Sequence, residues 1–342
     1  MFLKHQSSPY WLLIALFISG CLPSSCSRTE QKAISSADSL SRAFAVGFPV
    51  DTLEVIDRVS PGIDSLSYPR SIGYAPDGVL WVTDTARHVI LSLPQDQSAF
   101  IYQATIPLSY PYLAGFRGAS VYVFSPAFHH IYELVDGAIQ REIALQGPLP
   151  EEGGLRYAVA TDSGFAVKIA ANNGFASYLA LIDDDGAIQN TVDLKGDEWR
   201  YAGLLRSRAN DVFSLVGYLP QIDSLGASGL DSLRLVGFDS PMLPRTRQFQ
   251  KGDTHEPPLL TASAARTASH WFVLNMRPGW TQIDVYSLKG TLQYILTEPN
   301  PAFNQDFFPT DIAVFEMENG RFQIAVSVLK PEPRIDRYYW QP

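Results

Sequence analysis

Arginine and tyrosine recur next to short runs of β-branched and aromatic residues in this sequence. Arginine carries a planar, permanently charged fork that binds carboxylate, phosphate or sulfate through paired hydrogen bonds, and a tyrosine face can stack on a sugar or a peptide group. If the residues converge, they predict a site for a negatively charged ligand, formed by Arg70, Tyr112, Arg156, Tyr157, Arg200, Tyr201 and Asp311. The competing interpretation is structural, with the tyrosines packed between sheets and the arginines paired with acids.

Other clusters contain metal-ligating residue types without the spacing of a known metal site. The segment 252–256 holds an aspartate, a histidine and a glutamate, and His129 is followed directly by His130. Neighbouring residues of a strand point to opposite faces, so the two histidines are not expected to share an ion. The acidic run 183–186 lies between two strand-like segments and is interpreted as a hairpin turn rather than a calcium loop. We therefore predict no metal and no other cofactor.

Composition and motifs exclude several classes of function. The formal net charge is −9 and no basic stripe is present, so nucleic acid is not an expected partner. Aromatic residues make up 12% of the chain and charged residues only 18%, which favours a sheet-rich globular domain over a disordered chain. The sequence contains no nucleophile elbow, phosphate-binding loop, dinucleotide fingerprint or His-Glu-x-x-His motif.

The N-terminal residues predict export and attachment to a lipid. Lys4 precedes an apolar run at 10–18, which is too short to span a bilayer and is typical of a signal peptide. The sequence Ile18-Ser19-Gly20-Cys21 resembles the bacterial lipobox, which implies cleavage after residue 20 and acylation of Cys21. The alternative is ordinary secretory cleavage that leaves Cys21 as a free thiol. Several acyl chains on one cysteine would hold the protein on the membrane almost permanently.

These features divide the chain into a signal peptide at 1–20, a lipidated cysteine with a polar, serine-rich tether at 21–43, and a body at 44–342. The body contains no cysteine, so a hydrophobic core rather than disulfides must stabilise it. We expect a location in the cell envelope. Leu22 stands where some bacteria use aspartate for retention in the inner membrane, which favours the outer membrane.

An internal repeat predicts the elements that position the arginines and tyrosines. The hexapeptide at 68–73 returns in altered form at 110–115 and at 308–313, and two similar tetrapeptides start at residues 155 and 199. A period of roughly 40–50 residues is typical of propeller blades. Units therefore start near residues 68, 110, 155, 199, 257 and 308 and predict six blades, with 223–231 and 248–256 interpreted as insertions.

Each unit is expected to form one antiparallel sheet of four strands. Turn residues such as Pro76-Asp77-Gly78 separate short β-rich runs, which lie at 71–74, 79–84, 89–93 and 100–106 in the first unit and at 113–116, 121–124, 131–135 and 139–144 in the second. The last unit supplies about three strands. The unpartnered segment 52–59 is expected to complete that blade and close the ring. A β-sandwich or a solenoid is the alternative architecture.

The first unit also resembles a known repeat. Residues 68–73, followed by the segment 77–84, resemble the NHL repeat and the related TolB-like six-bladed propellers. The resemblance is partial in the second and last units and hard to see in the others. It implies a six-bladed β-propeller. Some relatives are lactonases or lyases that hold a divalent metal in the channel, whereas the set predicted here is richer in arginine than in carboxylate.

In a propeller the first strands of the blades converge on the central channel, which would place the arginines and tyrosines around one mouth. We therefore predict an envelope-anchored, non-enzymatic propeller that binds a small-molecule or protein ligand, anionic in character, at its channel mouth or face loops. The alternative function is a lactonase-like hydrolase or lyase with a divalent metal in the channel.

Overall fold

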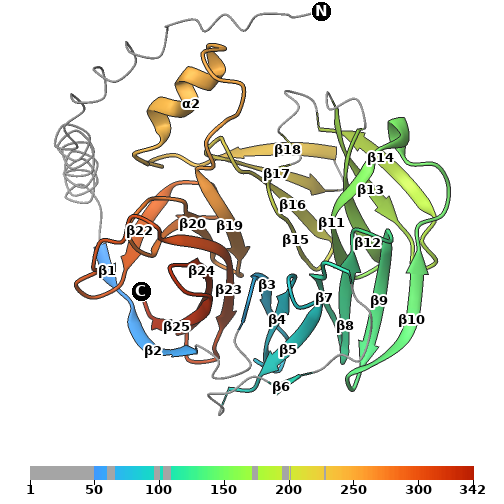
Figure 1. Cartoon of the computed structure of the whole chain (residues 1–342), viewed down its shortest axis with the longest axis horizontal. Coiled ribbons are helices and arrows are strands. Elements are labelled where there is room, and N and C mark those ends of the chain that lie inside the picture. Colours follow the sequence, from blue (N-terminus) through green and yellow to red (C-terminus); the bar gives the residue numbers. More distant parts are fainter. Residues whose placement is uncertain are drawn as a thin grey trace, which may run out of the picture.

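The computed structural model describes residues 50–59, 66–95, 101–102, 109–171, 176–194, 200, 202–226 and 229–342. Within these ranges the chain forms six sheets arranged around a central channel (Figure 1). The fold is a six-bladed β-propeller whose blades contain four antiparallel strands, as the repeat predicts. The predicted signal peptide, Cys21 and the tether lie outside the described residues.

The first three blades run from an innermost strand at the channel to an outer strand at the rim. Blade one consists of β3 (Pro69–Tyr74), β4 (Leu80–Asp84), β5 (Val89–Leu93) and β6 (Ile101–Tyr102). Blade two consists of β7 (Tyr112–Arg117), β8 (Ser120–Ser125), β9 (His130–Val135) and β10 (Ala138–Ala144). The 3-10 helix η1 (Pro150–Glu152) leads to blade three, which consists of β11 (Gly154–Thr161), β12 (Gly164–Ala170), β13 (Ser177–Ile182) and β14 (Ile188–Asp193).

The remaining blades follow the same plan. Blade four consists of β15 (Leu205–Arg208), β16 (Asp211–Val216), β17 (Gln221–Gly226) and β18 (Gly229–Arg234). Helix α2 (Leu243–Gln250) precedes blade five, which consists of β19 (Thr261–Arg266), β20 (His270–Asn275), β21 (Gln282–Ser287) and β22 (Leu292–Thr297). Blade six starts with β23 (Phe308–Glu316), β24 (Phe322–Lys330) and β25 (Arg334–Trp340).

The N-terminal segment closes the ring by joining two blades. Strand β2 (Glu54–Val59) adds antiparallel to β25 as the outer strand of blade six, which confirms the predicted closure. Strand β1 (Val50–Thr52) pairs in parallel with β22 of blade five, an addition that the sequence did not predict. Leu53 lies between these two strands and is fully buried in the core that blades five and six share.

Two sequence-based interpretations of the fourth unit are wrong. Residues 223–231 are not an insertion but part of the β17–β18 hairpin, whose outer strand is polar because much of it faces solvent. The innermost strand begins at Leu205 and not near residue 199. The long interval comes from the segment around α2, an exposed helix that stands off the ring (Figure 1). No helix in the described part of the chain is long and apolar enough to cross a membrane.

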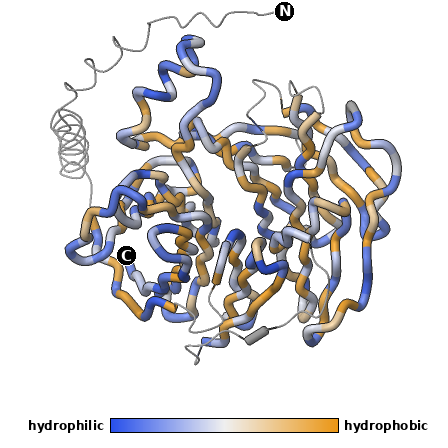
Figure 2. The backbone as a smooth tube through the Cα atoms, viewed as in Figure 1, coloured by the Kyte–Doolittle hydropathy of each residue, from blue (hydrophilic) through white to orange (hydrophobic). Residues whose placement is uncertain are grey.

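Hydrophobic packing between neighbouring blades holds the ring together. The middle strands are buried on both faces, and every residue of β12 is buried. Between blades five and six the rings of Phe322 and Trp340 stack at 5.5 Å between centroids, with Phe272 beside them. Figure 2 shows hydrophobic residues along the strands and a largely hydrophilic α2. Fully burying one such side chain is worth about 1.5–3 kcal/mol, so blade-to-blade contact is the main source of stability.

Blades four to six repeat a buried aspartate that was not predicted from the sequence. Asp223, Asp284 and Asp336 each follow an isoleucine near the start of the third strand, and all three are buried. Each accepts a hydrogen bond at 2.8 Å from the side chain two residues earlier. A buried carboxylate needs such partners, because an unsatisfied one would cost more than the fold can sustain.

Candidate functional site

Three of the predicted site residues meet inside the channel. Arg70 on β3, Tyr112 at the start of β7 and Tyr157 on β11 come from blades one, two and three. Arg70 forms hydrogen bonds with both phenols, and the two tyrosine rings meet edge to face at 5.7 Å. Blades one and three are not neighbours, so the Arg70–Tyr157 contact must cross the channel. It lies near the end where the innermost strands begin, which we call the amino-end mouth.

The electrostatics of this cluster keep Arg70 charged and Tyr157 protonated. Burial acts to lower the pKa of Arg70, but Tyr112, Tyr157 and Tyr68 outweigh it and raise the pKa above the ordinary arginine value. Burial raises the pKa of Tyr157 above its usual range, although Arg70 acts in the opposite direction. Arg70 also donates to the Tyr68 hydroxyl at 3.3 Å. The cluster therefore combines one fixed cation with three phenol groups.

Two other predicted arginines do not join this cluster. Arg200 donates to both carboxylate oxygens of the buried Asp223, through Nε at 2.9 Å and Nη2 at 2.7 Å. Arg156 is exposed. The register of the β11–β12 pairing shifts at this residue, between Leu155 and Tyr157. Tyr201 lies outside the described residues. The pairing of Arg200 with Asp223 agrees with the alternative interpretation of the sequence, in which the arginines pair with acids.

A buried lysine lies close to this ion pair. Lys168 on β12 is 0% exposed, and its Nζ donates to the Gly203 carbonyl at 2.8 Å and to the Ser214 hydroxyl at 2.6 Å. Burial lowers the pKa of Lys168 to about 7, with Arg200 acting in the same direction and Asp223 against it. The amine therefore changes its charge near neutral pH while it remains inside the fold.

Asp311 lies deeper in the channel than the Arg70 cluster and is fully buried. Its carboxylate accepts hydrogen bonds from the Ile72 and Ile312 amides, each at 2.8 Å, and from the guanidinium of Arg206. Arg206 belongs to blade four and Asp311 to blade six, so this pair also spans the channel. Asp311 is one of the predicted site residues, whereas Arg206 was not predicted because it stands outside the Arg-Tyr pattern.

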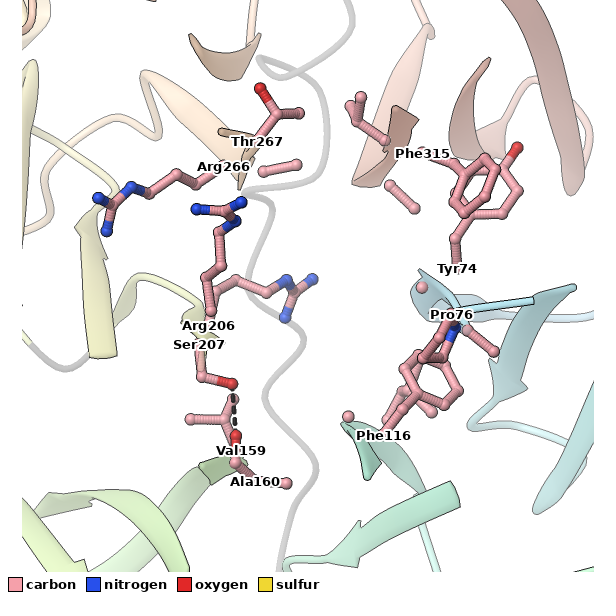
Figure 3. A pocket seen from close by; sticks show the side chains of 18 of the residues that line it. Tyr74, Pro76, Phe116, Val159, Ala160, Arg206, Ser207, Arg266, Thr267 and Phe315 are labelled. Carbon is pink, nitrogen blue, oxygen red and sulfur yellow. Dashed lines mark hydrogen bonds between the residues drawn. The ribbon is translucent and has the colours of Figure 1, made fainter. Parts of the chain in front are cut away.

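Beyond Asp311 the channel opens into a cavity of about 680 Å³ at its other end, the carboxyl-end mouth. The final residues of all six innermost strands and the turns that follow them line it. Figure 3 shows Tyr74, Phe116 and Phe315 on one side of the open space and Arg206 on the other, while the Arg266 side chain points away from it. The residues predicted from sequence lie at the beginnings of the innermost strands, so this cavity was not predicted.

The metal candidates lie apart from the channel. The carboxylate of Asp183 accepts hydrogen bonds from the Asp185 and Ala187 amides, which confirms that 183–186 is a hairpin turn. The His130 ring lies beside the Glu142 carboxylate on β10, and the segment 252–256 is an exposed loop after α2. Among the described residues, no group of three or more histidine, cysteine, aspartate or glutamate side chains is placed to hold a metal ion.

No protein-family model matches the sequence, and no curated sequence matches it. The fold is similar to that of a streptogramin B lyase, with a TM-score of 0.50 and 16% identity over 84% of this chain and 87% of that chain. A catalytically inactive virginiamycin B lyase from Staphylococcus aureus with quinupristin gives a TM-score of 0.49 and 14% identity over 82% and 87%. The WD40 propeller domain of Doa1 gives 0.47 and 13% over 83% and 81%. At 16% identity the similarity to the streptogramin B lyase supports the β-propeller fold alone, and the resemblance to NHL repeats stays a prediction.

Proposed function

We propose that this protein is an envelope-anchored, non-enzymatic binding propeller that holds an anionic group of its ligand on Arg70 at the amino-end mouth. The environment of Arg70 carries the proposal. Its side chain reaches across the channel to phenol groups, and among the described residues it forms no ion pair with a carboxylate. A partly buried guanidinium without a counter-ion is a binding site for carboxylate, phosphate or sulfate.

The charge inside the channel supports an anionic ligand. Among the described residues, the charged groups whose printed contacts cross the channel are Arg70, Arg206 and Asp311, and Asp311 neutralises Arg206. This count of two positive charges and one negative charge leaves one positive charge at Arg70. On a chain with a net charge of −9, such a localised positive site would select anions by contact rather than by long-range attraction.

The phenol groups would complete the site. A phenol oxygen that accepts a hydrogen bond from the guanidinium must direct its own O–H elsewhere. Tyr112 and Tyr157 can therefore donate to the same anion that Arg70 binds. The raised pKa of Tyr157 keeps that donor protonated at neutral pH.

Sulfate binding measured by isothermal titration calorimetry at low ionic strength tests this site. We expect one sulfate per chain for the wild-type protein. Arg70→Gln should weaken binding about 10- to 100-fold, because a hydrogen bond to a charged group is worth about 1.5–3 kcal/mol. Tyr157→Phe keeps the ring and removes one donor, so we expect a loss of about fivefold. Arg208→Gln, an exposed arginine at the opposite mouth, is the matched control and should bind normally.

Two results would overturn the assignment to Arg70. One is wild-type protein that shows no sulfate binding. The other is equal binding by wild type and a folded Arg70→Gln variant. If sulfate does bind, titrations with phosphate and citrate will show which class of oxyanion the site prefers.

Attachment to the membrane through acylated Cys21 is the second part of the proposal. In a bacterial host that processes lipoproteins, Cys21→Ser should move the protein from the membrane fraction to the soluble fraction of the envelope. The described body has no cysteine and no membrane-spanning helix, so folding should be unaffected. Cys26→Ser is the control and should stay membrane-bound. Persistence of Cys21→Ser in the membrane fraction would contradict the proposed anchor, and density-gradient separation of the wild type tests the proposed outer-membrane location.

A further inference from the structure

Asp311 and its neighbour Thr310 contact the segment of β3 that carries Arg70. Asp311 accepts a hydrogen bond from the Ile72 amide at 2.8 Å. The Thr310 hydroxyl donates to the Pro69 carbonyl, also at 2.8 Å. These contacts hold β3 on both sides of Arg70. Because a strand rises roughly 3.3 Å per residue, the Asp311 carboxylate lies within about 10 Å of the Arg70 backbone.

Arg206 approaches the same region from blade four. Its Nη2 donates to both carboxylate oxygens of Asp311. Burial raises the pKa of Tyr157, whereas Arg70 and, more weakly, Arg206 act to lower it. The Tyr157 phenol therefore lies within electrostatic range of both guanidiniums. An anion bound on Arg70 beside this phenol would lie within electrostatic range of the Arg206–Asp311 pair as well.

The Arg206–Asp311 pair contributes charges that cancel. Asp311 is fully buried, and its carboxylate accepts from the Ile72 amide, the Ile312 amide and Arg206. Amide and guanidinium donors are the partners that a buried carboxylate requires. Arg206 is thereby occupied, and the free positive charge of the channel is that of one guanidinium.

We propose, on the basis of the anion site at Arg70 proposed above, that Asp311 sets the charge selectivity of that site and limits it to an acid group with a single negative charge, such as a carboxylate or a sulfate ester. With Arg206 neutralised, a singly charged ligand on Arg70 leaves the channel neutral. A doubly charged ligand, such as a phosphate monoester, leaves a negative charge without a partner in a partly buried channel, which is costly.

Methyl sulfate and sulfate measure this selectivity, because they present similar oxygens with one and two negative charges. Isothermal titration calorimetry of both anions at low ionic strength and neutral pH gives the ratio of their dissociation constants. The wild-type protein should bind methyl sulfate at least as tightly as sulfate.

Two variants change the charge near the site in opposite directions. Asp311→Asn frees the charge of Arg206. At roughly 10 Å a unit charge alters affinity on the order of fivefold for each charge on the ligand, so methyl sulfate should gain about fivefold and sulfate about 25-fold. Arg206→Gln leaves Asp311 uncompensated, so both anions should bind more weakly and sulfate should lose more. Arg206→Gln combined with Asp311→Asn should return the ratio to near the wild-type value.

A second ion pair of the same kind provides the matched control. Arg266 donates to the exposed Asp211 at 2.9 Å, and its side chain points away from the carboxyl-end cavity. Arg266→Gln and Asp211→Asn should leave the ratio unchanged. A variant that only loosens the packing weakens both anions by the same factor, so the ratio separates a change in charge from a change in structure.

Equal ratios in wild type, Asp311→Asn and Arg206→Gln would overturn the proposal and leave Arg70 as an anion site. Wild-type protein that binds sulfate more than about tenfold more tightly than methyl sulfate would also overturn it. Wild-type protein that binds neither anion would contradict the Arg70 site itself. If Asp311→Asn loses its cooperative thermal transition, Arg206→Gln replaces a partly exposed side chain and tests the same ratio, which must then shift toward methyl sulfate.

Discussion

A chain that begins at residue 60 should fail to fold, whereas one that begins at residue 44 should unfold cooperatively. The shorter chain lacks β1 and β2, which complete blades five and six. It also loses Leu53, which is fully buried between those blades, and Asp57, which pairs with the buried Arg337. Burial of one leucine is worth about 1.5–3 kcal/mol, and a buried charge that loses its partner costs about 3–5 kcal/mol.

These losses approach the whole stability of a typical domain, roughly 5–15 kcal/mol. Differential scanning calorimetry of the two chains provides the measurement, with circular dichroism to record residual strand structure. A cooperative transition of the shorter chain at a temperature near that of the longer one would contradict the role of β1 and β2 in closing the ring.

Two point variants test whether the stability comes from burial of the Leu53 side chain or only from the presence of the N-terminal strands. Leu53→Ala should destabilise the longer chain by about 2–5 kcal/mol, since it removes a fully buried side chain. Val50→Ala, three residues earlier and 45% exposed, should have an effect within about 0.5 kcal/mol. Equal effects would show that Leu53 does not occupy the shared core.

Lys168 should make the protein more stable as the pH rises from 7 to about 10. Burial lowers its pKa in the folded chain to about 7 from the ordinary value of 10.5. Between these values the unfolded chain holds a proton that the folded chain has released, so the free energy of unfolding increases with pH. Its contribution is fully present above 10.5 and is lost as the pH falls through 7. The difference between these two pKa values corresponds to about 5 kcal/mol at most.

Urea unfolding of wild type and Lys168→Met across this pH range isolates the contribution of the lysine, because titrations elsewhere cancel in the difference. Lys289→Met, at an exposed turn, should show the wild-type dependence on pH. A difference between wild type and Lys168→Met that stays constant from pH 7 to 10 would contradict the buried position of the amine.

Much of the fold could be predicted from turn chemistry and repetition. The β3–β4 turn is an example, because Gly78 adopts a φ of 82° and Asp77 accepts a hydrogen bond from the Val79 amide. Such local signals place strand boundaries within one or two residues for β3, β4 and β5 and for all four strands of blade two, whereas β6 ends at Tyr102 and not at residue 106. They also leave 52–59 as a segment without a partner in its own unit, which predicts its pairing with the last blade.

Blade four could not be predicted in the same way. Its outer strand faces solvent, so its polar sequence is typical of a loop. The repeated aspartate of the third strands does not lie in a turn motif, so no local pattern marks it. Asp223 was therefore not recognised as the partner of Arg200, although Asp284 and Asp336 occupy the same position in the following blades.

Only part of the site follows from sequence, because its contacts link residues that are far apart in the chain. The cluster of Arg70 with Tyr112 and Tyr157 was predicted from residue types at the starts of the strands. The Arg206–Asp311 pair joins residues 105 positions apart in non-adjacent blades, and no local pattern marks it. The aromatic side chains of Tyr74, Phe116 and Phe315 at the carboxyl-end mouth were not predicted, because such residues at strand ends look the same in sequence whether they pack in the core or line a cavity.

The central claim, that the channel holds an anion on Arg70, is tested most directly by a crystal soaked in selenate, a sulfate analogue located by the anomalous scattering of selenium. In a crystal whose amino-end mouth is free of lattice contacts, we expect a selenium peak beside the Arg70 guanidinium and within hydrogen-bond distance of the Tyr112 and Tyr157 hydroxyls, absent in Arg70→Gln. A channel without that peak, or with Arg70 paired to a carboxylate, would contradict the claim.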